Sequence, residues 1–126
     1  MKKTIILAND DSDLLFLYSV VIGKSKVGKR RKIINCLNGQ KVLDLIDSRK
    51  VSLEDIILVI TDLKMPSVDG KELIRELRVR NYLGPIVVLT NSVEALRDEY
   101  LRKEASDIIL TPLGNDSLLR RIGNLL

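Results

Sequence analysis

The sequence of 126 residues contains no histidine and no tryptophan, one phenylalanine and a single cysteine, Cys36. Without histidine the chain cannot build a Ser-His-Asp or Cys-His site, a histidine general base or a histidine metal site of its own. One cysteine excludes an internal disulfide and a cysteine-rich zinc site, and it suits a reducing compartment. The chemistry that remains is that of carboxylates, hydroxyls, amines and amides, together with cations that prefer oxygen ligands.

Long apolar runs are also missing. The run at 56–60 is far shorter than the ~20 residues that span a bilayer, and the first residues lack the pattern of a signal peptide. We therefore expect a soluble, cytoplasmic protein without a membrane contact. Hydrophobic residues make up 45% of the chain and charged residues 30%, a composition that folds. The length fits one domain, so we expect residues 1–126 to form a single unit.

Short runs rich in Val and Ile alternate with longer stretches of helical period. This alternation predicts strand–helix units around a parallel sheet that is covered on both faces. Strands are predicted at 4–8, 33–37, 56–60, 86–89 and 108–110. Five apolar sets predict the inward faces of helices: Leu14, Leu17, Tyr18 and Val21; Val42, Leu45 and Ile46; Leu73, Ile74 and Leu77; Val93, Leu96, Tyr100 and Leu101; Leu118, Ile122 and Leu125.

Acidic residues directly follow two of the predicted strands. Asp10 and Asp11 come after the first strand, and Asp62 comes after the third. The carboxyl ends of parallel strands are where open α/β sheets bind ligands. Three carboxylates at one edge repel each other unless a cation lies among them, and Mg2+ with oxygen ligands fits such a place. The alternative for Asp11 is that it caps the following helix.

Taken together, these motifs resemble the receiver domain of two-component response regulators over nearly the whole chain. The resemblance rests on the acidic pair Asp10 and Asp11, the pattern Asp62-x-x-Met65-Pro66 with Asp69-Gly70, and Thr90 at the end of the fourth strand. It implies a flavodoxin-like (βα)5 fold, which is a doubly wound α/β fold with a five-stranded parallel sheet of order 2-1-3-4-5.

The resemblance implies a role for each site residue. Asp62 accepts a phosphoryl group as an acyl phosphate, which is nucleophilic chemistry of a carboxylate. Mg2+ is held by Asp11, Asp62 and the backbone carbonyl of Lys64, with Asp10 assisting through water, and Thr90 hydrogen-bonds the phosphoryl oxygens. Apart from gain and loss of this phosphoryl group, no enzyme activity is expected. The implied partners are a sensor histidine kinase or phosphotransfer protein and a downstream effector protein. A homodimer would use the fourth helix, fifth strand and fifth helix.

Three positions depart from the family pattern. Thr111 stands before Pro112, where the family has a lysine that pairs with the phosphoryl group, and threonine is short and uncharged. The proline is kept, so the resemblance implies a cis Thr111–Pro112 bond. Ile108 replaces an aromatic residue that takes part in switching, and Asn91 stands where the family has a very small residue. We expect phosphorylation with weakened coupling to the far face; the alternative is a pseudo-receiver that binds partners without phosphorylation.

Other features have a simpler explanation beside a functional one. The segment 24–32 holds six cations in nine residues, against a net charge of +4, and a solvated loop is favoured over nucleic-acid binding because aromatic platforms are absent. Lys64 is interpreted as a solvated loop residue rather than a phosphoryl ligand, and Cys36 as part of the core rather than a reactive thiol. An aspartate-nucleophile phosphatase is disfavoured because Lys64 stands where a second acid is typical of that class.

Overall fold

Five strands form one sheet in the order β2-β1-β3-β4-β5 in the computed structural model, which describes residues 3–126. All four pairings are parallel. The predicted sheet order and flavodoxin-like topology are confirmed, and each strand lies within one residue of its predicted bounds. The strands are β1 Thr4–Ala8, β2 Lys32–Cys36, β3 Ile56–Thr61, β4 Ile86–Thr90 and β5 Asp107–Leu110.

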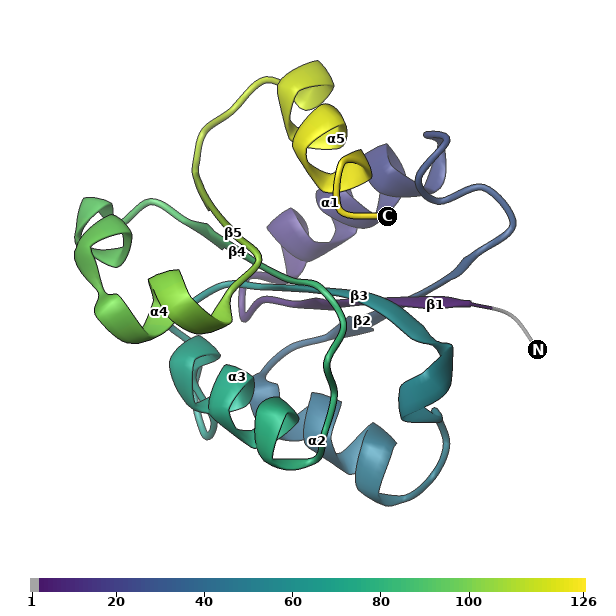
Figure 1. The fold of residues 1–126 in the computed structure, drawn as a ribbon. Coiled ribbons are helices and arrows are strands. Elements are labelled where there is room, and N and C mark those ends of the chain that lie inside the picture. Colours follow the sequence, from purple (N-terminus) through teal and green to yellow (C-terminus); the bar gives the residue numbers. More distant parts are fainter. Residues whose placement is uncertain (1–2) are drawn as a thin grey trace.

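Helices cover both faces of this sheet (Figure 1). On one face lie α1 Ser12–Gly23 and α5 Asn115–Gly123. On the other face lie α2 Gly39–Asp47, α3 Gly70–Val79 and α4 Glu99–Glu104. Two short 3-10 helices, η1 Leu53–Asp55 and η2 Val93–Arg97, complete the described elements.

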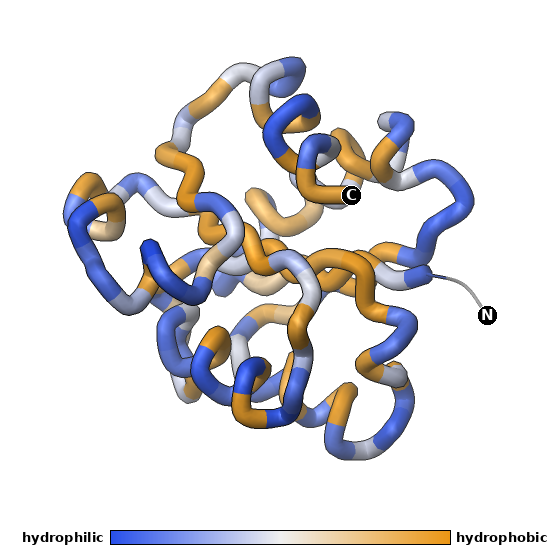
Figure 2. The backbone as a smooth tube through the Cα atoms, in the orientation of Figure 1, coloured by the Kyte–Doolittle hydropathy of each residue, from blue (hydrophilic) through white to orange (hydrophobic). Residues whose placement is uncertain are grey.

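The sheet separates two apolar cores. Because successive side chains of a strand point to opposite faces, Ile6 and Val88 pack against the layer of α2, α3 and α4, whereas Ile5 and Val87 pack against α1 and α5. The hydropathy colouring in Figure 2 follows this arrangement, with apolar residues along the sheet and polar residues on the outer turns. The central strands are therefore apolar at nearly every position, as the sequence predicts.

The predicted inward face of α1 is confirmed for Tyr18, which packs against the core, but is wrong for Leu14 and Leu17. Leu14 and Leu17 are 40% and 53% exposed, and the residues that are buried are Leu15 and Ile22. The helix is apolar almost all round, so its spacing does not define one inward face. As a result α1 carries an exposed apolar surface, to which Phe16 contributes with 68% of its area in solvent.

The fourth helical segment also differs from its prediction. The apolar spacing from Val93 to Leu101 predicts one helix, whereas the chain forms η2 and then the short helix α4. Between them the backbone of Asp98 is extended, and its side chain accepts the N–H of Leu101 at 3.0 Å as the N-cap of α4. The ammonium of Lys71 on α3 lies 2.8 Å from the same carboxylate. Side-chain capping at Asp98 thus interrupts the predicted helix.

Among residues 3–126, no helix combines the length and the apolar character needed to cross a membrane. The longest described helix is α1, with 12 residues, and a bilayer requires about 20.

Cys36 should be unreactive in the folded protein. The residue is 3% exposed, and burial raises the pKa of its thiol to about 11, although the charge of Lys41 opposes this effect. Because the thiolate is the reactive form, we expect an aromatic disulfide reagent to modify almost none of the native protein at neutral pH. One thiol per chain should react once urea unfolds the protein. Rapid, complete modification of the native state would contradict this expectation.

Candidate functional site

A small cavity opens at the carboxyl end of the sheet, where the loops after β1, β3 and β4 meet. Its volume is about 90 Å³. The residues around it come from four parts of the chain that are far apart in sequence. They are Asn9, Leu14, Tyr18, Asp62, Leu89, Thr90, Asn91 and Thr111. The structure therefore brings the predicted Asp62 and Thr90 to one cavity, together with the departing positions Asn91 and Thr111.

Asp62 directly follows β3 and is half-buried. Its backbone N–H donates to the carbonyl of Ala8 at 2.9 Å, and its Oδ1 accepts the N–H of Leu63 at 2.7 Å. Burial raises the pKa of the Asp62 carboxyl above its usual value, the Leu63 N–H lowers it, the charge of Asp10 raises it and that of Lys64 lowers it. The raised pKa shows that the negative charge of this site is only partly compensated by the protein.

The two acidic residues after β1 have different tasks. The Oδ1 atom of Asp11 accepts the N–H of Asp13 at 3.0 Å and of Leu14 at 3.1 Å, so Asp11 caps α1. Asp10 is the residue whose charge acts on Asp62. Within residues 3–126, no group of three or more acidic, histidine or cysteine side chains is placed to hold a metal ion. Capping uses the Oδ1 atom of Asp11, and the expected meeting of the Asp10, Asp11 and Asp62 carboxylates at a magnesium ion stays a prediction.

Asn9 is a site residue that the sequence pattern did not single out. It is 7% exposed, and it lines the cavity beside Asp62. Its Oδ1 accepts the N–H of Asp11 at 2.9 Å, which fixes the turn between β1 and α1. The available signal was a polar amide at the end of an otherwise apolar strand.

The oxygen donors at this edge fit a hard divalent cation. Asp10, Asp11 and Asp62 would supply carboxylates, and the loop after Asp62 would supply the backbone carbonyl of Lys64. Asp10, Lys64 and Met65 also line a hollow beside this loop. Mg2+ takes oxygen ligands and keeps several waters, and it would offset the charge that the protein leaves uncompensated at Asp62.

The opposite wall of the cavity is polar and uncharged. The buried Thr90 accepts the N–H of Ser92 at 3.1 Å through Oγ1, which leaves its hydroxyl proton free to donate. The N–H of Thr111 donates to the carbonyl of Thr90 at 2.8 Å, and the Thr111–Pro112 bond is cis, as predicted. None of the described residues around the cavity is a lysine or arginine.

Gly70 allows α3 to begin directly against the Asp62 loop. Its N–H donates to the carbonyl of Leu63 at 2.8 Å. A Cβ at this position would come within 2.8 Å of the Leu63 Cα atom and would overlap the carbonyl of Asp62. Asp69 caps the same helix by accepting the N–H of Glu72 at 2.8 Å. The Asp69-Gly70 motif therefore holds the site loop in place.

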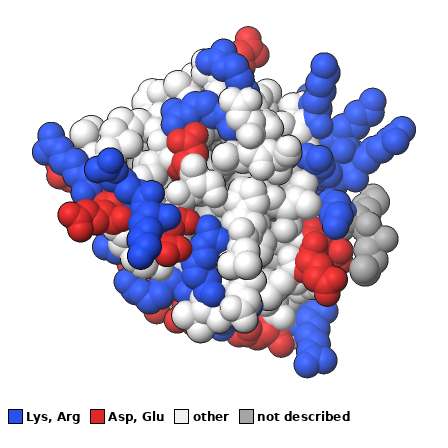
Figure 3. Space-filling model, in the orientation of Figure 1, with Lys and Arg blue, Asp and Glu red and all other residues white. Residues whose placement is uncertain are grey.

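The basic segment 24–32 lies at the other end of the sheet, between α1 and the start of β2. Figure 3 shows its Lys and Arg side chains as a group that projects from the molecule. The Arg31 guanidinium donates to the carbonyl of Val27 at 2.9 Å. None of the ion pairs found in residues 3–126 includes a residue of this segment. That this segment is a solvated loop rather than a nucleic-acid contact stays a prediction.

The fold and this cavity together define a class: doubly wound α/β domains that carry an acidic site at the carboxyl edge of a five-stranded parallel sheet. Residues 5–123 match the family model described as the response regulator receiver domain, and the chain belongs to this family. The predicted family is confirmed. Receiver domains are signalling domains of two-component systems, in which they interact with histidine kinases and effectors.

Curated relatives include regulators and a sensor protein. The chain is 36% identical over 73 residues to the transcriptional regulatory protein AruR of Pseudomonas aeruginosa, covering 58% of this chain and 30% of AruR. It is 39% identical over 77 residues to the sensor protein EvgS of Escherichia coli O157:H7, covering 60% of this chain and 6% of EvgS. The chain thus spans less than a third of the length of these relatives.

Solved structures share the fold over the full chain. The response regulator TrrA of Thermotoga maritima, determined in complex with Mg2+-BeF, superposes with a TM-score of 0.82 at 22% identity. The chemotaxis protein CheY4 of Vibrio cholerae also gives a TM-score of 0.82, at 17% identity. Both alignments cover 100% of each chain.

Replacing Asp62 with asparagine should stabilise the metal-free protein at neutral pH. Burial, assisted by the charge of Asp10, raises the pKa of Asp62 in the folded state. Its contribution to stability is then complete below the unfolded pKa near ~4 and is lost as the pH rises through the folded pKa. The neutral amide avoids this loss and can still accept the Leu63 N–H.

The measurement is urea unfolding of both proteins in EDTA across a pH series. We expect the free energy of unfolding of Asp62→Asn to exceed that of the wild type at neutral pH and the difference to close as the pH falls below about 4. A difference that grew toward acid pH would be inconsistent with this electrostatic account.

Proposed function

We propose that this receiver domain accepts a phosphoryl group on Asp62 with the help of Mg2+ and transmits the signal through protein contacts. The observation that carries the proposal is the half-buried Asp62 carboxylate in one cavity with the Thr90 hydroxyl, with the charge of Asp10 acting on it. Family membership and the Mg2+-BeF complex of the TrrA receiver support it.

The hydrogen bonds of Asp62 identify the attacking atom. Oδ1 accepts the Leu63 N–H at 2.7 Å, so Oδ2 is the oxygen available to attack phosphorus. A bond forms between Oδ2 and phosphorus, the bond from phosphorus to the donor breaks, and the electron pair leaves with the donor. Because these 126 residues include no histidine, a phosphohistidine donor must lie outside them; a small acyl phosphate is the other source.

Stabilisation of the transferred group depends on few residues. The Thr90 hydroxyl can donate to a phosphoryl oxygen, and the loop lysine Lys64 is the cation that already acts on Asp62. Bound Mg2+, held by Asp11, Asp62 and the Lys64 carbonyl with Asp10 assisting through water, would supply charge neutralisation, which phosphoryl transfer requires above all. Thr111 can offer a hydroxyl but no charge, so we infer that phosphorylation is coupled weakly to the far face.

The exposed apolar surface of α1 is a suitable contact for the phosphodonor protein. Leu14 lines the cavity of Asp62, and Leu17 lies one helical turn further along the same face. A partner that covers these side chains would bring its phosphoryl group to Asp62 and exclude water from the cavity.

The output surface that we propose consists of α4, β5 and α5. A hollow of about 360 Å³ lies there, and its lining includes Leu96 and the half-buried Ile108. Arg121 pairs with Asp107 through two hydrogen bonds of 2.6 and 2.9 Å, which tie α5 to β5. An effector or a second copy of the chain would bind this face.

Both acidic residues after β1 should contribute to Mg2+ affinity. We expect Asp11→Asn to weaken Mg2+ binding about tenfold or more, because it removes a proposed ligand while asparagine keeps the cap of α1. Asp10→Asn should weaken binding as well, because it removes the charge that acts on Asp62. Isothermal titration with Mg2+ measures both. An affinity of Asp11→Asn equal to that of the wild type would exclude Asp11 from the metal site.

Phosphorylation can be tested with acetyl phosphate and Mg2+. Intact-mass spectrometry should show one added phosphoryl group, which EDTA and the variant Asp62→Asn abolish. The matched control is Asp13→Asn, which removes an exposed acid of the first turn of α1. Thr111→Lys should increase the yield or lifetime of the acyl phosphate, because it adds a cation to the cavity wall. Phosphorylation that persisted in Asp62→Asn would disprove the assignment of the acceptor.

A further inference from the structure

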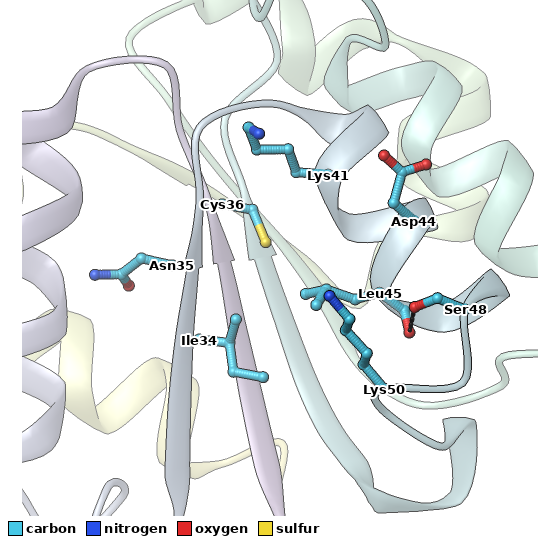
Figure 4. Close-up of a pocket in the computed structure, with 8 residues that line it drawn as sticks. All are labelled: Ile34, Asn35, Cys36, Lys41, Asp44, Leu45, Ser48 and Lys50. Carbon is cyan, nitrogen blue, oxygen red and sulfur yellow. Dashed lines mark hydrogen bonds between the residues drawn. The ribbon is translucent and has the colours of Figure 1, made fainter.

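A second hollow, separate from the Asp62 cavity, lies between the edge strand β2 and helix α2. Its volume is about 330 Å³, within the range of ligand-binding pockets. Figure 4 shows side chains from both elements around it, with Ile34 and the buried Cys36 on the strand side and Leu45 on the helix side. The polar side chains of the groove are Lys41, Asp44, Ser48 and Lys50.

One side of this groove is an unpaired strand edge. Within the sheet, β2 pairs only with β1. The N–H of Lys32 donates to the chain just before β1 at 2.9 Å, and the carbonyl of Cys36 accepts from the chain just after β1 at 3.0 Å. Because peptide groups alternate in direction along a strand, those of Ile33 and Asn35 face the open edge. Asn35 lines the groove, yet Figure 4 shows its side chain pointing to the opposite side of β2.

The charges of the groove favour an anionic partner. Figure 4 places Lys41 near one end of the groove, and the Lys50 side chain reaches toward Leu45 from the other end. Neither lysine takes part in any ion pair found in residues 3–126. The only acid of the groove, Asp44, accepts a hydrogen bond from the side-chain amide of Gln40 at 2.8 Å. The groove therefore has two cations with no acidic partner and one anion that is already hydrogen-bonded.

We propose that this groove binds an extended acidic segment of a partner protein, which adds a strand to the β2 edge. The backbone of the segment runs antiparallel to β2, and the residues between its acidic and apolar positions pair with the outward peptide groups of Ile33 and Asn35. Strand addition combines such main-chain hydrogen bonds with pockets for alternate side chains. An apolar side chain of the segment rests on Leu45, and acidic side chains on either side of it reach Lys41 and Lys50.

An extended segment of five residues is long enough to reach along the part of α2 that borders the groove. Residues i and i+4 of a strand are separated by about 13 Å, and the stretch of α2 from Lys41 to its C-cap Ser48 rises by about 10 Å. The pattern that fits is acidic-x-apolar-x-acidic, with the three specified side chains on the α2 side.

Two other occupants match the groove less well. A small anion could meet the lysines but would leave the open peptide groups of β2 without partners. A second copy of the chain would offer its own β2, whose sequence Lys-Ile-Ile-Asn-Cys has a lysine and no acid. Neither occupant provides both a strand for the free edge of β2 and acidic groups for Lys41 and Lys50.

The probe is a labelled, capped peptide with Glu-Thr-Ile-Thr-Glu at its centre, measured by fluorescence anisotropy. We expect saturable binding of this peptide. A Lys-Thr-Ile-Thr-Lys peptide should bind with an affinity lower by a factor of about ten or more. A peptide with proline in place of the second threonine should lose binding by a similar factor, because proline cannot donate to a strand pair. Equal affinity of the proline peptide would show that no strand is added and would overturn the proposal.

Variants of the protein locate the binding. Lys41→Glu with Lys50→Glu should weaken the acidic peptide about tenfold or more, whereas the matched pair Lys24→Glu with Lys103→Glu, which makes the same charge change at exposed positions elsewhere, should alter it much less. Equal effects of the two pairs would show that binding reflects net charge alone. Sedimentation must also show a monomer, because a dimer that the Lys41 and Lys50 changes disrupt would assign the groove to a second copy.

Discussion

A negative charge held half-buried at the end of β3 is the constraint around which the functional end of this protein is arranged. The sheet fixes Asp62 through the bond of its N–H to Ala8, and the Leu63 N–H supports one carboxylate oxygen. Burial outweighs that support and raises the pKa of the carboxyl. A site in this state gains free energy from any positive charge that approaches it. A divalent cation and a phosphoryl donor that arrives with a cation can supply this charge, which the protein itself supplies only in part.

The remaining walls of the cavity keep this imbalance. Asn9 and Thr111 are uncharged, so the interior adds neither a further anion nor a strong cation to Asp62. Lys64 acts from an exposed position, where water screens its charge. The Asp62 carboxylate is therefore the only charged group that lines this cavity among the described residues. Gly70 lets α3 begin in close contact with the backbone of Asp62 and Leu63.

Much of the fold could be predicted because the central strands are apolar throughout and because α2, α3 and α5 have one apolar face each. The face of α1 could not, since a helix that is apolar on all sides has no preferred phase. The break at Asp98 and the capping of α1 by Asp11 have one cause: an aspartate side chain can accept hydrogen bonds from backbone N–H groups. Sequence spacing identifies such aspartates but does not show which task each performs. Asn9 was missed because the acids beside it were the stronger signal.

The two ends of the sheet differ in the charge of the segments that lie there. The acidic loops follow the carboxyl ends of the strands, and the cations of residues 24–32 precede β2 at the amino ends. Opposite charges at the two ends of a rigid sheet produce an electric dipole along it, and such a dipole turns in the field of a charged partner before contact. Near a positively charged surface the protein presents Asp62 first, and near a negatively charged surface it presents the basic segment and holds Asp62 outward. The charge pattern thus biases the orientation in which the domain meets another molecule, even when neither the acidic loops nor the basic segment contacts that molecule.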